Sequence, residues 1–239
     1  MCGLAGVINL NGEAISPPIL QRMTDAIEHR GPDDEGQWIE GNVGLGHRRL
    51  SIIDLSPAGH QPMVSANHRY VLAYNGEVYN FKELRSELEA QGYWFRSKTD
   101  SEVVLNALDA WGVKALNRFN GMFAFSLWDR KEKKLLLARD RYGIKPLYYV
   151  QKNGIFSFGS EQKAILADSR IQRTVDKKAL LEYFTFQNIF TDRTLLEGVK
   201  LLPAGCYAEL DLKSAEPKLR KTRYWDYDFR EPTEKSDKQ

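Results

Sequence analysis

The first residues that could do chemistry stand at the N-terminus, where Cys2 directly follows Met1. The thiolate is the nucleophilic form of cysteine, and an ordinary thiol has a pKa of about 8.5. An α-amine has a pKa of about 7.7–8.0, far below that of lysine. Once Met1 is removed, Cys2 carries both groups, and its neutral amine can take the thiol proton directly or through a water. The position therefore predicts a nucleophile with its own general base, unless the cysteine stands at a tolerant terminus by chance.

A thiol that attacks an acyl carbon needs hydrogen-bond donors for the oxyanion that forms. The stretch YNGEVYN offers two such donors at an expected strand end, the side-chain amide of Asn75 and the backbone N–H of Gly76. Asn-Gly is also the strongest short turn signal, so a hairpin turn is the alternative. The dipeptide alone does not decide between an oxyanion hole and a turn.

Charged residues elsewhere could bind the two ends of a small zwitterion. Arg48 and Arg49 stand between apolar residues in GHRRLSIIDL, and arginine suits two parallel hydrogen bonds to a carboxylate. Neighbouring strand residues point to opposite faces, so the two arginines are expected to separate, and a solvated position is the alternative for each. Asp100 could hold an ammonium group, cap the helix expected to follow it, or do both.

Composition excludes several classes of protein. The chain is 42% hydrophobic and 28% charged, which indicates a soluble globular protein, and its net charge of +2 gives no electrostatic case for nucleic acid. No apolar run approaches the ~18 residues of a membrane span, and residues 1–10 do not resemble a signal peptide. Two cysteines and four histidines predict neither a disulfide framework nor a metal site, and favour a reducing cytoplasm. Cys206 is interpreted as a small packed hydrophobe.

Hydrophobic periodicity predicts the elements that must position these residues. Strands are expected at 3–10, 43–55, 70–79, 122–129, 134–140, 146–150, 155–160 and 204–212. Helices are expected at 17–29, 81–92, 160–167 and 176–184, and directly after Asp100. A loop is expected at 30–36, Asn80 is expected to cap the helix at 81–92 together with Glu83, and 230–239 is expected to be a disordered tail or linker. Strands and helices in separate blocks predict an α+β fold.

Ten stretches of the sequence occur together in an order that is specific. The chain resembles the class II glutamine amidotransferase domain, the N-terminal nucleophile type, and in particular that of glutamine-hydrolysing asparagine synthetases. The resemblance covers roughly residues 2–210. The matching stretches are MCGLAGV, HRGPDDEG, GHRRLSIIDL, QPM, YNGEVYN, TDSEV, GMFAFSLWD, ARDRYGIKPLYY, SFGSEQKAI and LPAGCY.

This resemblance implies a four-layered αββα sandwich and assigns roles to the residues described above. Cys2 is implied to be the nucleophile after removal of Met1, with its own amine as the base. The resemblance implies that Asn75 and Gly76 form the oxyanion hole. It further implies that Arg49 binds the α-carboxylate of glutamine, and that Asp100 and the segment of Glu77 bind its α-amino group.

The resemblance also bears on a charged segment, RDRYGIKPLYY, which is similar to the family's segment near the ammonia exit. Two interpretations of its charged residues have equal weight: a role near the ammonia exit, or ordinary positions in a turn and an edge strand. These are Arg139, Asp140, Arg141 and Lys145.

Domain organisation follows from the same resemblance. Residues 2–210 are expected to form the glutaminase domain, and 211–239 a linker or tail leading toward a synthetase domain. In the family that second domain binds ATP and activates aspartate, and its SGGxDS loop does not occur in this sequence. No cofactor is therefore expected for this chain, and ATP and Mg²⁺ are expected only for the synthetase domain. A fragment of a longer protein is favoured, and a stand-alone subunit is the alternative.

The activity that the resemblance implies is hydrolysis of glutamine to glutamate and ammonia through a thioester on Cys2. The expected partners are glutamine and a synthetase domain or subunit that receives the ammonia, with a homodimer as one assembly left open. Neither nucleic acid nor membrane is expected. A catalytically silent glutamine-sensing or scaffold domain is the alternative, and a retained Met1 would favour it. The ammonia acceptor stays open between aspartate and another carboxylate.

Overall fold

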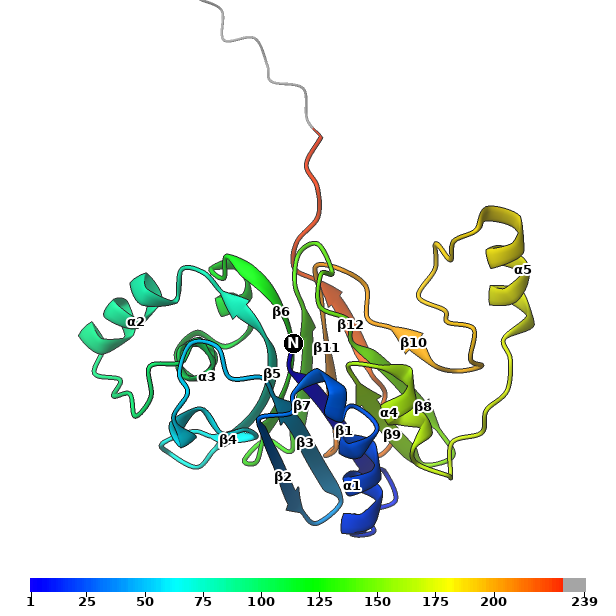
Figure 1. The fold of residues 1–239 in the computed structure, drawn as a ribbon, viewed down its shortest axis with the longest axis horizontal. Coiled ribbons are helices and arrows are strands. Elements are labelled where there is room, and N and C mark those ends of the chain that lie inside the picture. The colour runs from blue at the N-terminus through cyan, green and yellow to red at the C-terminus, as the bar shows by residue number, and fades with distance from the viewer. Residues whose placement is uncertain (230–239) are drawn as a thin grey trace, which may run out of the picture.

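Two antiparallel six-stranded sheets pack face to face in the computed structural model, which describes residues 1–229 (Figure 1). The expected tail at 230–239 lies outside the described residues. In spatial order the first sheet contains β10 (Lys200–Leu201), β8 (Tyr148–Lys152), β9 (Ile155–Gly159), β1 (Gly3–Asn9), β3 (Val43–Arg49) and β2 (Asp34–Glu40). The second contains β12 (Arg220–Arg223), β11 (Cys206–Asp211), β7 (Lys134–Arg139), β6 (Gly121–Asp129), β5 (Tyr70–Val78) and β4 (Met63–Val64).

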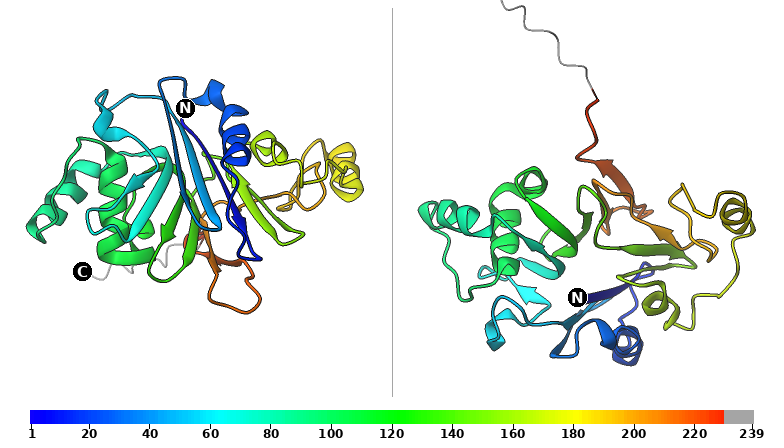
Figure 2. Two further views of the ribbon diagram at one scale, coloured as in Figure 1. Left: turned by 90° about the horizontal axis from the view of Figure 1, so that it is seen from below. Right: turned by 45° about the horizontal axis from the view of Figure 1, so that its top comes forward.

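Helices cover the outer face of each sheet (Figure 2, left). The first sheet carries α1 (Pro17–Asp25) and α4 (Gln162–Leu166), and the second carries α2 (Phe81–Ala90) and α3 (Asp100–Trp111). A fifth helix, α5 (Lys177–Phe186), stands at the side of the molecule. The 3-10 turns are η1 (Glu28–Arg30), η2 (Pro57–Gly59) and η3 (Gly112–Asn117). The expected α+β class and the four-layered αββα sandwich are confirmed.

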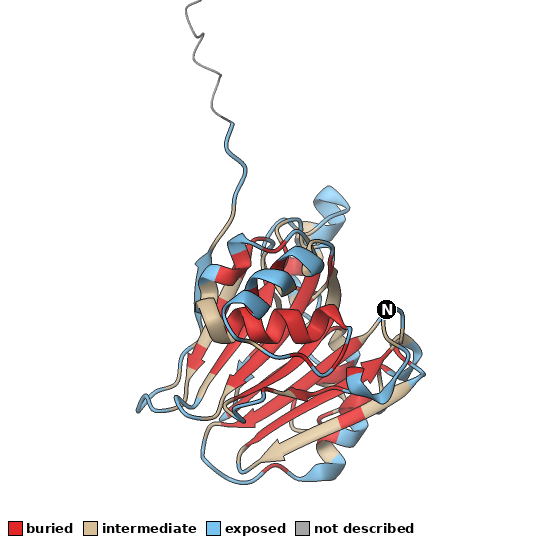
Figure 3. Cartoon of the chain, turned by 90° about the vertical axis from the view of Figure 1, so that its left-hand side faces the viewer, coloured by how far each residue is buried: buried red, intermediate tan, exposed pale blue. Residues whose placement is uncertain are grey.

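The central apolar layer forms between the two sheets. Leu4 and Phe158 of the first sheet pack in one cluster with Trp128 and Leu137 of the second, and all four side chains are buried. The neighbouring residue, Leu136, faces the opposite side, where it packs under the helices. Figure 3 shows that the central strands are buried along most of their length. Because the central strands are covered on both faces, β1, β7 and β9 are nearly continuous buried runs instead of alternating ones.

Two expected boundaries on either side of β3 are wrong. The strand ends at Arg49, not at residue 55, because its partners end there: Gly3 of β1 pairs with Arg48, and Asp34 of β2 pairs with Arg49. Residues 50–55 therefore form a loop, in which Leu55 is exposed. The loop expected at 30–36 is wrong from Asp34 onward, since β2 begins there and obtains its hydrogen bonds from β3.

The first turns of the helices also differ from expectation. Asn80 occupies the N-cap position of α2, but its side chain makes no capping bond, so the expected capping box is wrong. Its amide instead donates to the carbonyl of Arg118 and accepts from the N–H of Asn120.

The end of one helix and several strands also differ from expectation. The helix expected at 17–29 ends as an α-helix at Asp25. Strands β2, β4, β10 and β12 were not expected; β2 and β12 are polar or charged along most of their length, and β4 and β10 have two residues each.

Candidate active site

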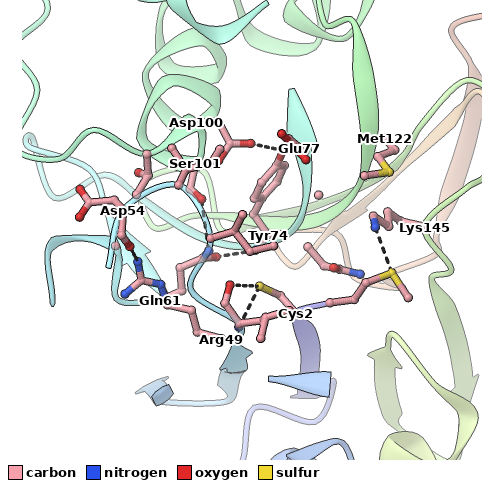
Figure 4. Close-up of a pocket in the computed structure, with 18 residues that line it drawn as sticks. Cys2, Arg49, Asp54, Gln61, Tyr74, Glu77, Asp100, Ser101, Met122 and Lys145 are labelled. Atoms are coloured by element: carbon pink, nitrogen blue, oxygen red, sulfur yellow. Dashed lines mark hydrogen bonds between the residues drawn. The ribbon is translucent and has the colours of Figure 1, made fainter. Parts of the chain in front are cut away.

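One pocket brings together the six residues to which the sequence resemblance assigned roles (Figure 4). They come from the start of β1, the end of β3, the second half of β5 and the start of α3. The pocket therefore lies where ends of interior strands of both sheets meet the first turn of a helix. The predicted residues that line it are Cys2, Arg49, Asn75, Gly76, Glu77 and Asp100.

Cys2 is held through its side chain by the backbone of Leu50 and through its carbonyl by Arg30. Its Sγ accepts a hydrogen bond from the N–H of Leu50 at 3.3 Å and lies 3.6 Å from the carbonyl oxygen of Leu50. Arg30 Nε donates to the carbonyl oxygen of Cys2 at 3.0 Å, and Arg30 is itself paired with Glu161 at 2.9 Å. Burial raises the pKa of the Cys2 thiol, and the Leu50 N–H, the N-terminal amine and Arg49 oppose that rise. The thiol therefore needs a base to become a nucleophile at neutral pH.

Asn75 and Gly76 lie inside β5, where they pair with Ala124 and Phe123 of β6. The alternative of a hairpin turn is therefore wrong, and the dipeptide is not at the strand end either, because β5 continues to Val78. The Asn75 side chain is 1% exposed, and its Nδ2 has no hydrogen-bond partner among the described residues. An orphaned buried donor is costly. Its presence in the pocket lining provides an N–H that a ligand oxygen can satisfy.

Gly76 leaves no room for a side chain. A Cβ atom at this position would collide with the carbonyl oxygen of Met122 on the neighbouring strand. The close approach of β6 thus requires glycine, while the backbone of Gly76 remains part of the pocket lining.

Arg49 is a buried cation whose partners are backbone carbonyls. Its Nη1 donates to the carbonyl of Ser56 at 2.9 Å, and its Nη2 donates to the carbonyl of Asp54. A Cβ on Gly59 would overlap this guanidinium, so a larger residue there would displace the end of the Arg49 side chain. Across residues 1–229, no carboxylate forms an ion pair with Arg49. Its charge is therefore available to an anionic ligand.

Arg48 points to the opposite face of β3, as expected from strand alternation. It forms ion pairs with Asp25 of α1 at 2.6 Å and with Glu35 of β2 at 3.1 Å. The expectation that the two arginines separate is confirmed, and the alternative of solvated strand residues is wrong, since both are at most 9% exposed.

Asp100 is a buried carboxylate at the first position of α3. Its Oδ2 accepts from the Tyr74 hydroxyl at 2.8 Å and from the Val78 N–H at 3.0 Å. Capping falls instead to Thr99, whose hydroxyl accepts from the N–H of Glu102, so a capping role of Asp100 is wrong. Burial raises the pKa of Asp100, against the lowering effect of the Tyr74 and Val78 bonds. Within the described part of the chain it has no cationic partner, so it can receive an ammonium group.

Sequence reasoning assigned no role to two residues that support the site. Gln61 Oε1 accepts from the Tyr74 N–H at 2.7 Å, which anchors the strand beside Asn75. Arg30 fixes the backbone of Cys2 from outside the pocket lining. They lie in QPM and HRGPDDEG, stretches in which residue type alone suggested no chemistry. Lys145, one of the charged residues of RDRYGIKPLYY, lines the pocket directly. The interpretation of the charges of RDRYGIKPLYY as ordinary edge residues does not fit Lys145, which is 5% exposed.

Two further observations concern metal clusters and membrane-spanning helices. Among residues 1–229, no cluster of three or more His, Cys, Asp or Glu side chains is arranged to hold a metal ion. In the same part of the chain, no helix has the length and apolar character needed to cross a bilayer.

Comparison with known proteins gives one family match and several relatives. The chain matches the family described as a glutamine amidotransferase domain over residues 1–225. Glutamine-hydrolysing asparagine synthetase 3 of Bacillus subtilis is 37% identical over 242 residues, which cover 99% of this chain and 38% of that protein. Asparagine synthetase 1 of the same organism is 41% identical over 209 residues, covering 86% and 33%. The chain thus spans little more than a third of the length of these relatives.

A solved structure shares the fold. Glutamine phosphoribosylpyrophosphate amidotransferase from Bacillus subtilis, complexed with ADP and GMP, aligns with a TM-score of 0.68 over 94% of this chain and 49% of that one. The two are 18% identical, so this likeness concerns the fold alone. It confirms the four-layered sandwich that the sequence resemblance implied.

The buried environment of Cys2 predicts slow alkylation at neutral pH. A raised pKa leaves less thiolate, so in the chain that retains Met1 the midpoint of the pH–rate profile should lie above that of a cysteine peptide measured in parallel. The rate can be followed by mass spectrometry with iodoacetamide, in a Cys206→Ala background. A midpoint at or below that of the peptide would contradict the prediction.

Proposed function

Since the chain belongs to the glutamine amidotransferase domain family, we propose that it hydrolyses glutamine to glutamate and ammonia. One observation carries the proposal. A thiol, a cation without a carboxylate partner and a carboxylate without a cationic partner line one pocket, in the described part of the chain. These groups complement the side-chain amide, the α-carboxylate and the α-ammonium of glutamine.

Substrate recognition is proposed to use the two ends of the zwitterion. Arg49 binds the α-carboxylate through its guanidinium, which forms charge-assisted hydrogen bonds. Asp100 binds the α-ammonium, with Glu77 beside it in the pocket. An ammonium next to Asp100 favours the ionised carboxylate and so offsets the effect of burial on its pKa. The γ-amide then reaches Cys2 and Asn75.

The first chemical step is proposed to start after Met1 is removed. The neutral α-amine of Cys2 takes the Sγ proton, and the thiolate attacks the γ-carbonyl carbon. A C–S bond forms, and the π electrons of the carbonyl move onto its oxygen. That oxyanion accepts hydrogen bonds from Asn75 Nδ2 and the Gly76 N–H. The C–N bond then breaks, the terminal ammonium returns its proton to the leaving nitrogen, and ammonia departs from a γ-glutamyl thioester.

The second step regenerates the thiol. The terminal amine, neutral again, takes a proton from a water whose oxygen attacks the thioester carbon. The same two donors bind the second oxyanion. The C–S bond breaks, Cys2 recovers its proton, and glutamate leaves.

The released ammonia is proposed to be consumed by a synthetase outside this chain. The relatives are named glutamine-hydrolysing asparagine synthetases, and this chain matches little more than a third of their length. We infer that residues 2–210 supply ammonia to an ATP-dependent, amide-forming synthetase in the cytoplasm, and that 211–239 link the two parts. ATP and Mg²⁺ would serve that synthetase. The acceptor is a carboxylate, with aspartate as the first candidate.

Replacement of the nucleophile tests the proposed function. Cys2→Ala should abolish release of glutamate from glutamine, because no thioester can form. Cys2→Ser should also be very slow, since an amine with a pKa of about 8 poorly deprotonates a hydroxyl. Glutamate can be assayed enzymatically, and thermal unfolding should be unchanged in both variants. Activity near the wild-type rate in Cys2→Ala would refute the site, and a wild type without turnover would favour the silent glutamine-sensing domain.

The oxyanion role of Asn75 predicts a change in kcat. Asn75→Ala removes one donor, which typically lowers kcat by about 10²–10³. KM should change much less, because the ground-state carbonyl needs the donor less than the oxyanion does. Steady-state kinetics with glutamine measure both constants. A higher KM with an unchanged kcat would assign Asn75 to binding instead.

Arg49 and Arg48 form a matched pair for testing substrate recognition. Arg49→Lys loses a planar fork, and loss of a charge-assisted bond of about 1.5–3 kcal/mol should lower kcat/KM on the order of 10–150-fold. Cys2 should still react with a small alkylating reagent. Arg48→Lys should leave kcat/KM nearly unchanged, because its ion pairs lie on the far face of β3. The reverse pattern would show that the carboxylate site is misplaced.

A further inference from the structure

Lys145 is a buried lysine that the proposed mechanism does not use. It is 5% exposed and lines the pocket together with Cys2. Its Nζ lies 3.1 Å from the Sδ atom of Met1, the residue that precedes the nucleophile (Figure 4). Within residues 1–229, it forms no ion pair with a carboxylate. The Lys145 ammonium therefore lies beside the N-terminus, and no carboxylate of the described residues neutralises its charge.

The backbone around Lys145 is fixed by buried charges. The Asp140 carboxylate, which is fully buried, accepts from the N–H groups of Tyr142, Ile144 and Lys145 at 2.9–3.1 Å. Arg139 Nε donates to the carbonyl of Lys145 at 2.8 Å. Both backbone groups of Lys145 are thus held, so its side chain extends from a rigid turn toward the N-terminus.

Charged groups from several elements surround the Lys145 ammonium. Burial lowers the pKa of Lys145, and Arg30 of η1 adds to this effect. Cys2 at the start of β1, Asp140 of the same turn and Glu77 of β5 oppose it. Arg49 and Asp100 also act on the Cys2 thiol, in opposite directions. Lys145 is therefore the cation that lines the pocket beside the N-terminus, while Arg30 lies behind it and is paired with Glu161.

Removal of Met1 changes what Lys145 faces. The thioether contact is lost, and the new α-amine belongs to Cys2. A second positive charge next to a fixed ammonium is unfavourable, whereas a neutral amine carries no such penalty. A thiolate at the same residue is favoured by the lysine charge. N-terminal nucleophile chemistry requires both a neutral amine that can accept a proton and a thiolate that can attack, and the lysine charge favours each of them.

We propose that Lys145 is a positioning residue whose fixed ammonium keeps the α-amine of processed Cys2 in its neutral, proton-accepting form and favours the Cys2 thiolate. The inference rests on the proposed function, in which this amine is the general base. Lys145 need not touch glutamine. Its effect therefore falls on the pH dependence of kcat and not on KM.

The acid limb of the kcat profile tests the inference, because that limb reports the base in the substrate complex. Lys145→Met should move it to higher pH by roughly 1 unit, so that kcat on the acid side falls about tenfold. Lys145→Arg should retain the wild-type limb, and KM should be similar throughout. Lys131→Met, which removes an exposed lysine between β6 and β7, is the matched control. A Lys145→Met profile that coincides with the wild type overturns the inference.

A second readout does not depend on turnover. In processed protein with the Cys206→Ala background, Lys145→Met should raise the pH midpoint of Cys2 alkylation by iodoacetamide, with removal of Met1 verified by intact mass. Lys145→Gln replaces Lys145→Met if the latter does not fold. An unchanged midpoint overturns the inference even if the wild type hydrolyses glutamine. A shifted midpoint in a protein that releases no glutamate supports the charge effect while refuting the proposed function.

Discussion

Face-to-face packing of the two sheets is the constraint on which the site depends. Cys2 and Arg49 belong to the ends of β1 and β3 in the first sheet, whereas Asn75, Gly76 and Glu77 lie on β5 in the second. The apolar layer between the sheets sets their separation. Near the pocket, a polar contact between the sheets fixes this separation: His47 Nε2 of β3 lies 2.9 Å from the carbonyl oxygen of Tyr74 of β5. Full burial lowers the pKa of His47 to about 4, so the ring is neutral and its N–H can donate across the interface.

Two buried charges of opposite sign line the pocket, and neither forms an ion pair within residues 1–229. On the far face of β3, by contrast, Arg48 is paired with Asp25 and Glu35. In the pocket, Arg49 is held by carbonyl oxygens, and Asp100 is held by a hydroxyl and an N–H. Such hydrogen bonds offset part of the cost of burying a charge but do not neutralise it. Buried charges without an opposite charge are characteristic of functional sites, where a bound ligand supplies the missing partner.

Local signals misled the sequence analysis where distant pairing overrode them. Asn75-Gly76 favours a turn by itself, yet β6 pairs with both residues and draws them into a continuous strand. Asn80 has the residue type and spacing of a helix cap, yet the loop at Asn120 competes successfully for its side chain. The apolar run after Arg49 suggests a longer strand, yet no neighbouring strand remains to pair with it. In each case the deciding contacts come from other segments of the chain, so no local pattern around the residue reveals them.

By itself, the sequence determined the α+β class, most of the central strands and helices, and a candidate list of site residues. These follow from periodicity, residue type and the order of motifs, which are local properties of the chain. Only the tertiary structure decided that Cys2, Asn75, Arg49 and Asp100 share one pocket, because that requires two sheets to pack in one register. It also decided that the Asn75 amide has no partner in the described chain and that Lys145 stands beside the N-terminus. Burial and hydrogen-bond satisfaction depend on all the neighbours at once, and no single segment encodes them.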